Sequence, residues 1–289
     1  SAMEHNAVMR PLQQMSQHGV RFERVPCDAE GCLDLRALER MLRPDTRLVL
    51  LCHASNVSGT VQDAERAGQV CAAHGVPFAL DAAQTAGHLP IDFGRLGLAA
   101  LSVPGHKGLM GPQGIGALIL RPDFAAALEP FVSGGTGSAS DSEEQPSYMP
   151  DRFESGTPNV PGIYGWEAAL EYLQGVTVET VAAHDRVLAE QFLDGLQRVP
   201  GVVLYGPRTA AGRVGVFSLD FPGKDNAEAA YRLECEYGIL TRCGLHCAPS
   251  AHKTLGTFPR GSVRLSFGWF TTEEEVGRAL EAIAAVSAG

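Results

Sequence analysis

Two residues of this sequence, a lysine and an aspartate, stand where their side chains could take part in chemistry. Lys107 lies in the segment Pro104–Gly108 (PGHKG), whose glycines permit a tight turn and leave room beside the amine. Asp81 directly follows the apolar run Val76–Leu80, which we predict to be a buried strand. Its carboxylate is therefore expected to be partly desolvated and to need a cation or strong donors to stay ionised.

An amine and an acid of this kind are the two groups that pyridoxal 5′-phosphate (PLP) requires. A lysine binds this cofactor covalently, and an acid keeps the pyridine nitrogen protonated so that the ring can accept electrons. Ligands of α/β sheets bind at strand ends, where both residues are predicted to lie. Alternatively, Lys107 is a surface lysine in a glycine-rich loop and Asp81 caps a helix.

A candidate nucleophile stands near the C-terminus. Cys247 lies in Leu245–Pro249 (LHCAP), which we predict to be a loop. A thiol becomes a nucleophile when nearby positive charge stabilises its thiolate, and Arg242 and His246 are close in sequence. The alternative is a buried structural cysteine. The seven cysteines include no pair of Cys-x-x-Cys motifs, so no metal site is expected.

A second arginine interrupts an apolar run. Arg264 lies in Ser262–Ser266 (SVRLS), which otherwise has the pattern of a strand. A charged side chain in such a strand is expected to have a carboxylate partner or to face solvent. The guanidinium group suits a carboxylate partner, because it can donate two parallel hydrogen bonds to it.

The composition excludes several classes of protein. The 289 residues carry a formal net charge of −10, which argues against binding to nucleic acid or to anionic membranes. No apolar run approaches the ~20 residues that a membrane-spanning helix needs. No secretory signal is visible, and the cysteines are expected to be reduced thiols. We therefore expect a cytoplasmic protein.

The order of apolar and amphipathic segments predicts an α/β protein of two parts. Residues 1–158 alternate strands with helices, which indicates a large domain with a mainly parallel central sheet. Residues 159–289 indicate a smaller α+β domain that ends in a helix starting at Thr272. Ser133–Gln145 is polar, rich in glycine and serine, and predicted to be a mobile loop. Strands are expected at Val20–Val25, Arg47–Cys52, Val76–Leu80, Ala99–Val103, Ile115–Leu120, Val202–Leu204, Val214–Leu219, Ile239–Arg242 and Val263–Phe267.

Five segments in this order resemble the class V aminotransferases, and most of all the cysteine desulfurases and selenocysteine lyases. They are HASNVSGT (53–60), DAAQ (81–84), GHK (105–107), RFESGTPN (152–159) and RCGLHCAP (242–249). The resemblance covers essentially the whole chain. It implies the PLP-transferase fold of type I and a PLP-dependent enzyme.

The resemblance implies a role for each candidate cofactor residue. His5 would stack on the pyridine ring and shuttle protons, and Asn56 and Gln84 would lie near the phenolic oxygen. Taken alone, His5 could be an ordinary residue at a helix start, and Asn56 a turn residue.

The resemblance also implies the contacts of the two ends of the cofactor. Asp81 would pair with the ring nitrogen, Lys107 would carry the cofactor, and His106 would contact the phosphate. Gly156 and Thr157 would reach the phosphate in a partner subunit, which implies a homodimer with shared sites.

For the substrate, the resemblance implies that Cys247 attacks the sulfur and that Arg264 binds the α-carboxylate. Asn56 and Arg242 would assist on the substrate side. L-cysteine or L-selenocysteine would be the substrate, and a sulfur-acceptor protein is a further expected partner.

Two departures from the family pattern bear on the cofactor. Pro104 stands where related enzymes often carry a hydroxyl residue that donates to the phosphate, and proline offers neither a hydroxyl nor an N–H. The usual segment ahead of the stacking histidine, which includes a phosphate-binding turn, is also missing. Three functions therefore stay open: a cysteine desulfurase, another PLP reaction such as transamination, or a catalytically impaired homologue.

Overall fold

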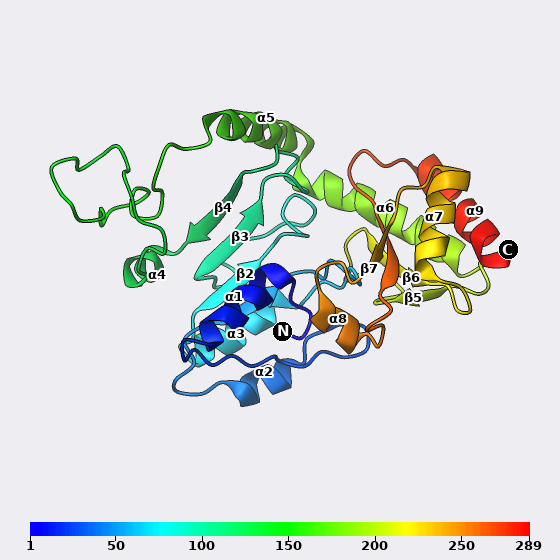
Figure 1. Ribbon diagram of the computed structural model, residues 1–289, viewed down its shortest axis with the longest axis horizontal. Helices are drawn as coiled ribbons and strands as arrows, with labels where there is room; N and C mark the ends of the chain where they lie inside the picture. The colour runs from blue at the N-terminus through cyan, green and yellow to red at the C-terminus, as the bar shows by residue number, and fades with distance from the viewer.

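Two four-stranded sheets, each with its own apolar core, form the frame of the molecule (Figure 1). The structure is a computed structural model that describes residues 1–289. The first sheet has the strand order β1-β2-β3-β4 and the second the order β5-β6-β8-β7. Figure 1 shows them in different halves of the molecule, joined by α5 (Val160–Val176) and α6 (Val178–Leu196).

The first sheet is mainly parallel, as predicted. Strands β1 (Val49–Cys52), β2 (Phe78–Asp81) and β3 (Ala100–Pro104) run parallel, and β4 (Gly116–Leu120) is antiparallel to β3. The apolar side chains of β2 and β3 are buried, as in strands covered on both faces, whereas Leu118 and Ile119 of β4 are exposed. Helices α1 (Asn6–Ser16), α2 (Leu35–Met41), α3 (Ala64–Ala73) and α4 (Pro122–Ala127) belong to this half.

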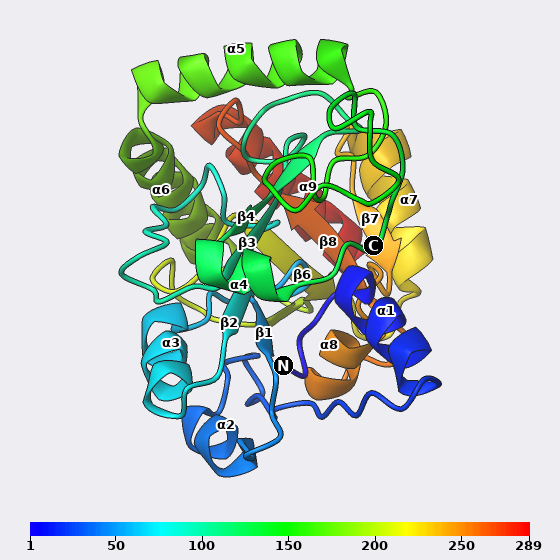
Figure 2. The same cartoon turned by 90° about the vertical axis from the view of Figure 1, so that its left-hand side faces the viewer.

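Two helices in this half begin at aspartate caps. Asp34 accepts a hydrogen bond from the Ala37 N–H at the start of α2, and Asp63 accepts one from the Arg66 N–H at the start of α3. Each carboxylate satisfies a backbone donor that the first helical turn leaves free. Helix α2 contacts α3, and α3 contacts β2 (Figure 2).

The second sheet is antiparallel and is covered by helices. It contains β5 (Val203–Tyr205), β6 (Val216–Asp220), β7 (Arg242–Gly244) and β8 (Ser262–Ser266). Its core includes Phe192 of α6, Phe217 of β6 and Ile283 of α9. The remaining helices are α7 (Asn226–Tyr237), α8 (Pro249–Thr254) and α9 (Glu273–Ala288). Thr272 and Glu275 form the capping box that the sequence indicated at the start of α9.

Three sequence expectations differ from the structure. Val20–Val25 forms no strand, because no neighbouring strand pairs with it. The predicted strand Ile239–Arg242 is displaced to Arg242–Gly244, since Gly238 ends α7 in the left-handed conformation and the next residues lead into the sheet. The short helices α4 and α8 were not expected; each begins with a proline at its first position.

The connection between α4 and α5 has no regular secondary structure, in line with the predicted loop at Ser133–Gln145. Figure 1 shows it extending away from both sheets, and Phe131 in it is fully exposed. The division of the chain at residues 158 and 159 stays a prediction. Trp166 of α5 packs against the core of the first sheet. None of the helices combines the length and the apolar character needed to cross a membrane.

Candidate active site

The carboxyl ends of the parallel strands bring polar side chains to one edge of the first sheet. Cys52 pairs with Asp81 in register, and Asp81 pairs with Ser102. The Asp81 carboxylate is partly buried, and it accepts a hydrogen bond of 2.9 Å from the Ala83 N–H. Burial raises the pKa of Asp81, while that N–H and the charges of Lys107 and His5 act in the opposite direction.

Lys107 follows β3 in a tight turn. The turn is held by backbone hydrogen bonds from the Gly105 N–H to Ile115 and from the Gly111 N–H to Gly105. The amine makes no hydrogen bond or ion pair within the chain, and the residue is exposed to an open cavity. The surrounding protein nevertheless removes enough water from the amine to lower the pKa of Lys107, and the charge of Asp81 opposes this shift.

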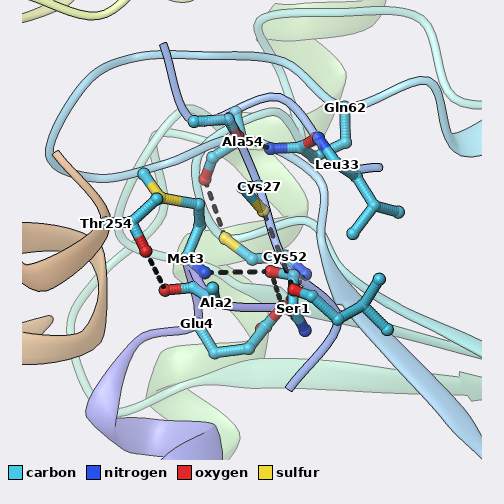
Figure 3. Close-up of polar contacts among 12 residues, drawn as sticks. Ser1, Ala2, Met3, Glu4, Cys27, Leu33, Cys52, Ala54, Gln62 and Thr254 are labelled. Carbon is cyan, nitrogen blue, oxygen red and sulfur yellow. Dashed lines mark hydrogen bonds and ion pairs between the residues drawn. The ribbon is translucent and has the colours of Figure 1, made fainter. Parts of the chain in front are cut away.

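His5 reaches the same edge because the segment before α1 is fixed to the end of β1 (Figure 3). Buried Glu4 accepts a hydrogen bond of 3.0 Å from the Cys52 N–H, and the Cys52 thiol donates to the Ala54 carbonyl at 2.8 Å. His5 itself caps α1, since its Nδ1 accepts from the Ala7 N–H at 3.0 Å. Burial lowers the pKa of His5, and the nearby positive charge of Lys107 adds to the effect.

A cavity of about 610 Å³ joins these residues. It therefore brings together six of the predicted site residues from four separate segments of the chain. They are His5, Asn56, Asp81, Gln84, His106 and Lys107. Cys52 also lines this cavity and was not singled out in the sequence; its position one residue before the HASN segment, at a predicted strand end, was the available signal.

Asn56 links the first half of the molecule to the two candidate substrate residues of the second. Its Nδ2 donates to the His246 carbonyl at 2.8 Å, and its own carbonyl accepts from the Arg264 guanidinium at 3.1 Å. Oδ1 of Asn56 and Nε of Arg264 are buried without a partner in the chain. Unpaired polar atoms on two residues in direct contact favour a polar ligand at this point.

Cys247 lies beside this link, exposed to solvent. Its backbone and that of His246 have φ of 57° and 48°, in the left-handed region that costs an ordinary residue about 1 kcal/mol or more. The Asn6 N–H donates to the Cys247 carbonyl at 2.8 Å and helps to hold this conformation. The thiol is therefore presented outward on a loop with a fixed backbone.

The positive charge near Cys247 comes from arginine and not from histidine. Burial lowers the pKa of His246 to about 3, so this ring is neutral at pH 7 and cannot stabilise a thiolate by charge. Arg264 is close enough to Cys247 for the two to influence one another. Arg242 pairs with Arg264 across β7 and β8, so both side chains lie on one face of the sheet.

Two other predicted residues lie elsewhere in this chain. Gly156 and Thr157 are exposed in the loop that extends away from both sheets, and neither lines the cavity. The structure holds one chain, so their predicted contact with a partner subunit stays a prediction.

A second cavity of about 570 Å³ is also lined by Lys107 and His106. Residues of both halves line it, including His88 after β2 and the aromatic turn Trp269–Thr271 before α9. Sequence reasoning did not single out these residues. The only available signal for His88 was its position four residues after Gln84.

The sequence matches a known family model, Aminotransferase class-V, over residues 1–279. The chain belongs to the aminotransferase class-V family. Among its relatives, a probable cysteine desulfurase of Pyrococcus abyssi is 34% identical over 277 residues, which cover 94% of this chain and 68% of the relative. A cysteine desulfurase of Escherichia coli is 34% identical over 284 residues, covering 96% and 68% of the two chains.

Solved structures of this class V family agree with the fold. The apo structure of a cysteine desulfurase from Thermococcus onnurineus NA1 superposes with a TM-score of 0.93 at 33% identity, covering 100% of this chain and 72% of the other. The cysteine desulfurase CsdA of Escherichia coli, in its S-sulfonic acid form, gives 0.88 at 30% identity, covering 99% and 70%. The predicted fold class, PLP-transferase type I, is confirmed.

The residues of the larger cavity fit the pyridoxal part of PLP. An amine without a partner and a carboxylate lie on the same cavity, and the His5 ring lines it as well. The carboxylate would face the ring nitrogen and the amine would hold the cofactor. At the phosphate end, His106 offers a donor, whereas Pro104 lines the cavity without one.

Proposed function

We propose that this chain is a PLP-dependent cysteine desulfurase that releases sulfur from L-cysteine, gives L-alanine, and carries the sulfur as a persulfide on Cys247. One observation supports the proposal above others. Lys107 and Asp81, from the ends of different strands, line one cavity, and Arg264 and Cys247 adjoin it through Asn56. The names of the relatives agree with this activity.

Arg264 and Asn56 would bind the substrate. The Nε of Arg264 and the Oδ1 of Asn56 are buried without partners, so a carboxylate and an amino group of an amino acid could satisfy them. A guanidinium that is partly desolvated binds a carboxylate more strongly than one in bulk water. The substrate would then be oriented with its side chain toward Cys247.

Lys107 would move the α-proton of the bound substrate. Its lowered pKa makes a free amine more available near neutral pH than in an ordinary lysine. Bound PLP supplies an electron sink for the cleavage of the Cα–H bond. His5, also on the cavity and with a lowered pKa, is the second group placed to transfer a proton.

Cys247 would take the sulfur. Its thiolate attacks the substrate sulfur, a new S–S bond forms, and the C–S bond of the substrate breaks with its electron pair left on carbon. Protonation of that carbon gives alanine, and the persulfide passes to an acceptor thiol. Arg264 is the positively charged side chain close to Cys247.

The remaining parts of the proposal concern partners. We propose a homodimer in which Gly156 and Thr157 reach the phosphate site of the other subunit. L-selenocysteine is an alternative substrate, a sulfur-acceptor protein is the expected partner, and the cytoplasm is the proposed location.

Product analysis tests the activity. The protein supplied with PLP and L-cysteine should form alanine and sulfane sulfur in equal amounts, and Cys247→Ser should form none. Cys243→Ser is the matched control, because Cys243 is equally exposed but alternates with Arg242 to the other face of β7. Sulfur release from Cys247→Ser at the parent rate excludes the persulfide route, and a keto acid in place of alanine indicates transamination.

A further inference from the structure

A part-buried hydrogen bond between a histidine and an aspartate joins the two halves of the molecule next to Lys107. Nδ1 of His88, in the loop after β2, lies 2.6 Å from Oδ2 of Asp185 in α6, and the two side chains are 19% and 10% exposed. The other carboxylate oxygen of Asp185 is buried without a partner. The proposed chemistry uses neither residue.

The His88 ring packs directly on the residue that follows Lys107. A Cβ added to Gly108 would lie 2.5 Å from Cδ2 and 2.7 Å from Nε2 of His88. A Cβ added to Gly87 would lie 2.1 Å from the Gly108 carbonyl oxygen. Only glycine permits this close approach, so the loop that carries His88 is in firm contact with the turn that carries Lys107.

His184, the residue before Asp185, contacts the aromatic turn Trp269–Thr271. Nε2 of His184 lies 2.9 Å from the Thr271 carbonyl, and its ring packs edge-on against Trp269 with centroids 5.2 Å apart. Trp269 and Thr271 line the 570 Å³ cavity together with His88 and Lys107. His184 and Asp185, consecutive residues of α6, therefore contact two different segments that line the cavity next to Lys107.

We propose that the His88–Asp185 pair positions Lys107, through the contact of the His88 ring with Gly108, for cofactor attachment and proton transfer. The inference rests on the proposed function and adds a positioning pair to it. A helix of one half of the molecule then sets the geometry of the reactive lysine in the other. An error of about 1 Å in such a position is enough to lower a rate ~100-fold.

Four variants separate positioning from simple stability. His88→Asn keeps a donor to Asp185 but removes the ring from Gly108, and Asp185→Leu removes the acceptor while filling its volume. Asp185→Asn is the conservative rescue, because it still accepts from a neutral imidazole. Glu190→Gln is the control, since Glu190 pairs with Arg186 on the exposed face of the same helix.

The first measurement uses the protein without cofactor. The chain has three lysines, so acetic anhydride labelling of Lys107 can be compared with that of Lys224 and Lys253 by peptide mass spectrometry. Lys107 is already accessible, and the titratable or charged groups close to it are Asp81, Cys52, Arg264 and His5. A displaced amine regains water and its ordinary pKa, so labelling of Lys107 at pH 8 should fall about threefold in His88→Asn and Asp185→Leu.

The second measurement uses the loaded enzyme. The two disrupting variants should lose about tenfold in kcat with KM for cysteine within about twofold, and the circular dichroism of the visible cofactor band should change. Asp185→Asn should stay close to the parent in both measurements. Lys107 labelling in His88→Asn and Asp185→Leu equal to that of Glu190→Gln overturns the proposal. A parent protein that takes up no PLP contradicts the proposed function instead, and the labelling result still decides the role of the pair.

Discussion

Asn56 and His246, 190 residues apart in the chain, are joined by a hydrogen bond of 2.8 Å from the Asn56 side chain to the His246 carbonyl. The backbone of Asn56 also accepts from Arg264. One residue of the first half thus fixes the loop of the candidate nucleophile and the candidate carboxylate-binding arginine at the same time. Because Asn56 and Lys107 line the same cavity, the Cys247 loop and Arg264 are both held next to that cavity.

Substitution of Asn56 should therefore loosen the Cys247 loop. Asn56→Ala removes a donor, and Asn56→Asp places a carboxylate against the His246 carbonyl, so the second variant should be the more impaired. We expect kcat for desulfuration to fall about tenfold in Asn56→Ala, the factor that matches the loss of one hydrogen bond of about 1.4 kcal/mol. Steady-state kinetics with both variants provide the measurement, and an Asn56→Asp enzyme as active as the parent would show that the link is dispensable.

Replacement of Arg264 by lysine should weaken substrate binding more than turnover. Lysine keeps the charge but cannot donate two parallel hydrogen bonds to a carboxylate, so KM for cysteine should rise about tenfold or more. Arg242→Lys is the comparison, because Arg242 lies opposite Arg264 in register but is exposed. Equal KM values for the two variants would argue against a specific carboxylate site at Arg264.

Two glycines with positive φ test how closely the loop of His88 must approach the turn that carries Lys107. Gly75 and Gly87 have φ of 66° and 83°. A Cβ added to Gly75 would meet no atom within 4 Å, whereas a Cβ added to Gly87 would lie 2.1 Å from the Gly108 carbonyl oxygen. Gly75→Ala should lower the free energy of unfolding by about 1 kcal/mol, whereas Gly87→Ala should lower it by about 3 kcal/mol or more. Urea unfolding of the two variants gives the comparison, and similar losses would show that the loops can separate freely.

Stability should fall in mild acid because of a buried histidine. His252 has no exposed surface, and burial lowers its pKa to about 4, below the 6.5 of an unfolded chain. Between pH 6.5 and 4 the unfolded state binds the extra proton, so the free energy of unfolding decreases as the pH falls, by up to about 1.4 kcal/mol per pH unit for this residue. Urea midpoints of His252→Gln should depend less on pH than those of the parent, while exposed His18→Gln should follow the parent. An unchanged slope in His252→Gln would contradict the assignment.

Much of the first sheet could be predicted from the sequence. Its strands are short apolar runs closed by Asp81 or followed by glycine turns, and Asp34, directly before a helical pattern, signals the start of α2. Val20–Val25 was wrongly predicted as a strand because alternation in a sequence does not reveal whether a partner strand exists. The displacement of the strand at Arg242 has a similar cause, since local pattern does not set register.

Part of the candidate site could also be predicted from the sequence. Asp81 and Lys107 could be expected at one sheet edge because parallel strands end together. The contact of Asn56 with His246 and the pair of His88 with Asp185 could not, because residues 190 and 97 positions apart meet only through the packing of the two halves. The neutral state of His246 likewise depends on burial, which its neighbours in sequence do not show.

The most direct test of the account is to identify the lysine that takes up PLP. The purified protein is incubated with PLP, its visible spectrum is recorded before and after borohydride, and the peptides are analysed by mass spectrometry. We expect a visible band that borohydride removes and a reduced cofactor on the peptide of Lys107. A protein whose spectrum does not respond to PLP, or a cofactor found only on Lys224 or Lys253, would contradict the assignment of Lys107 and Asp81 to one cofactor site.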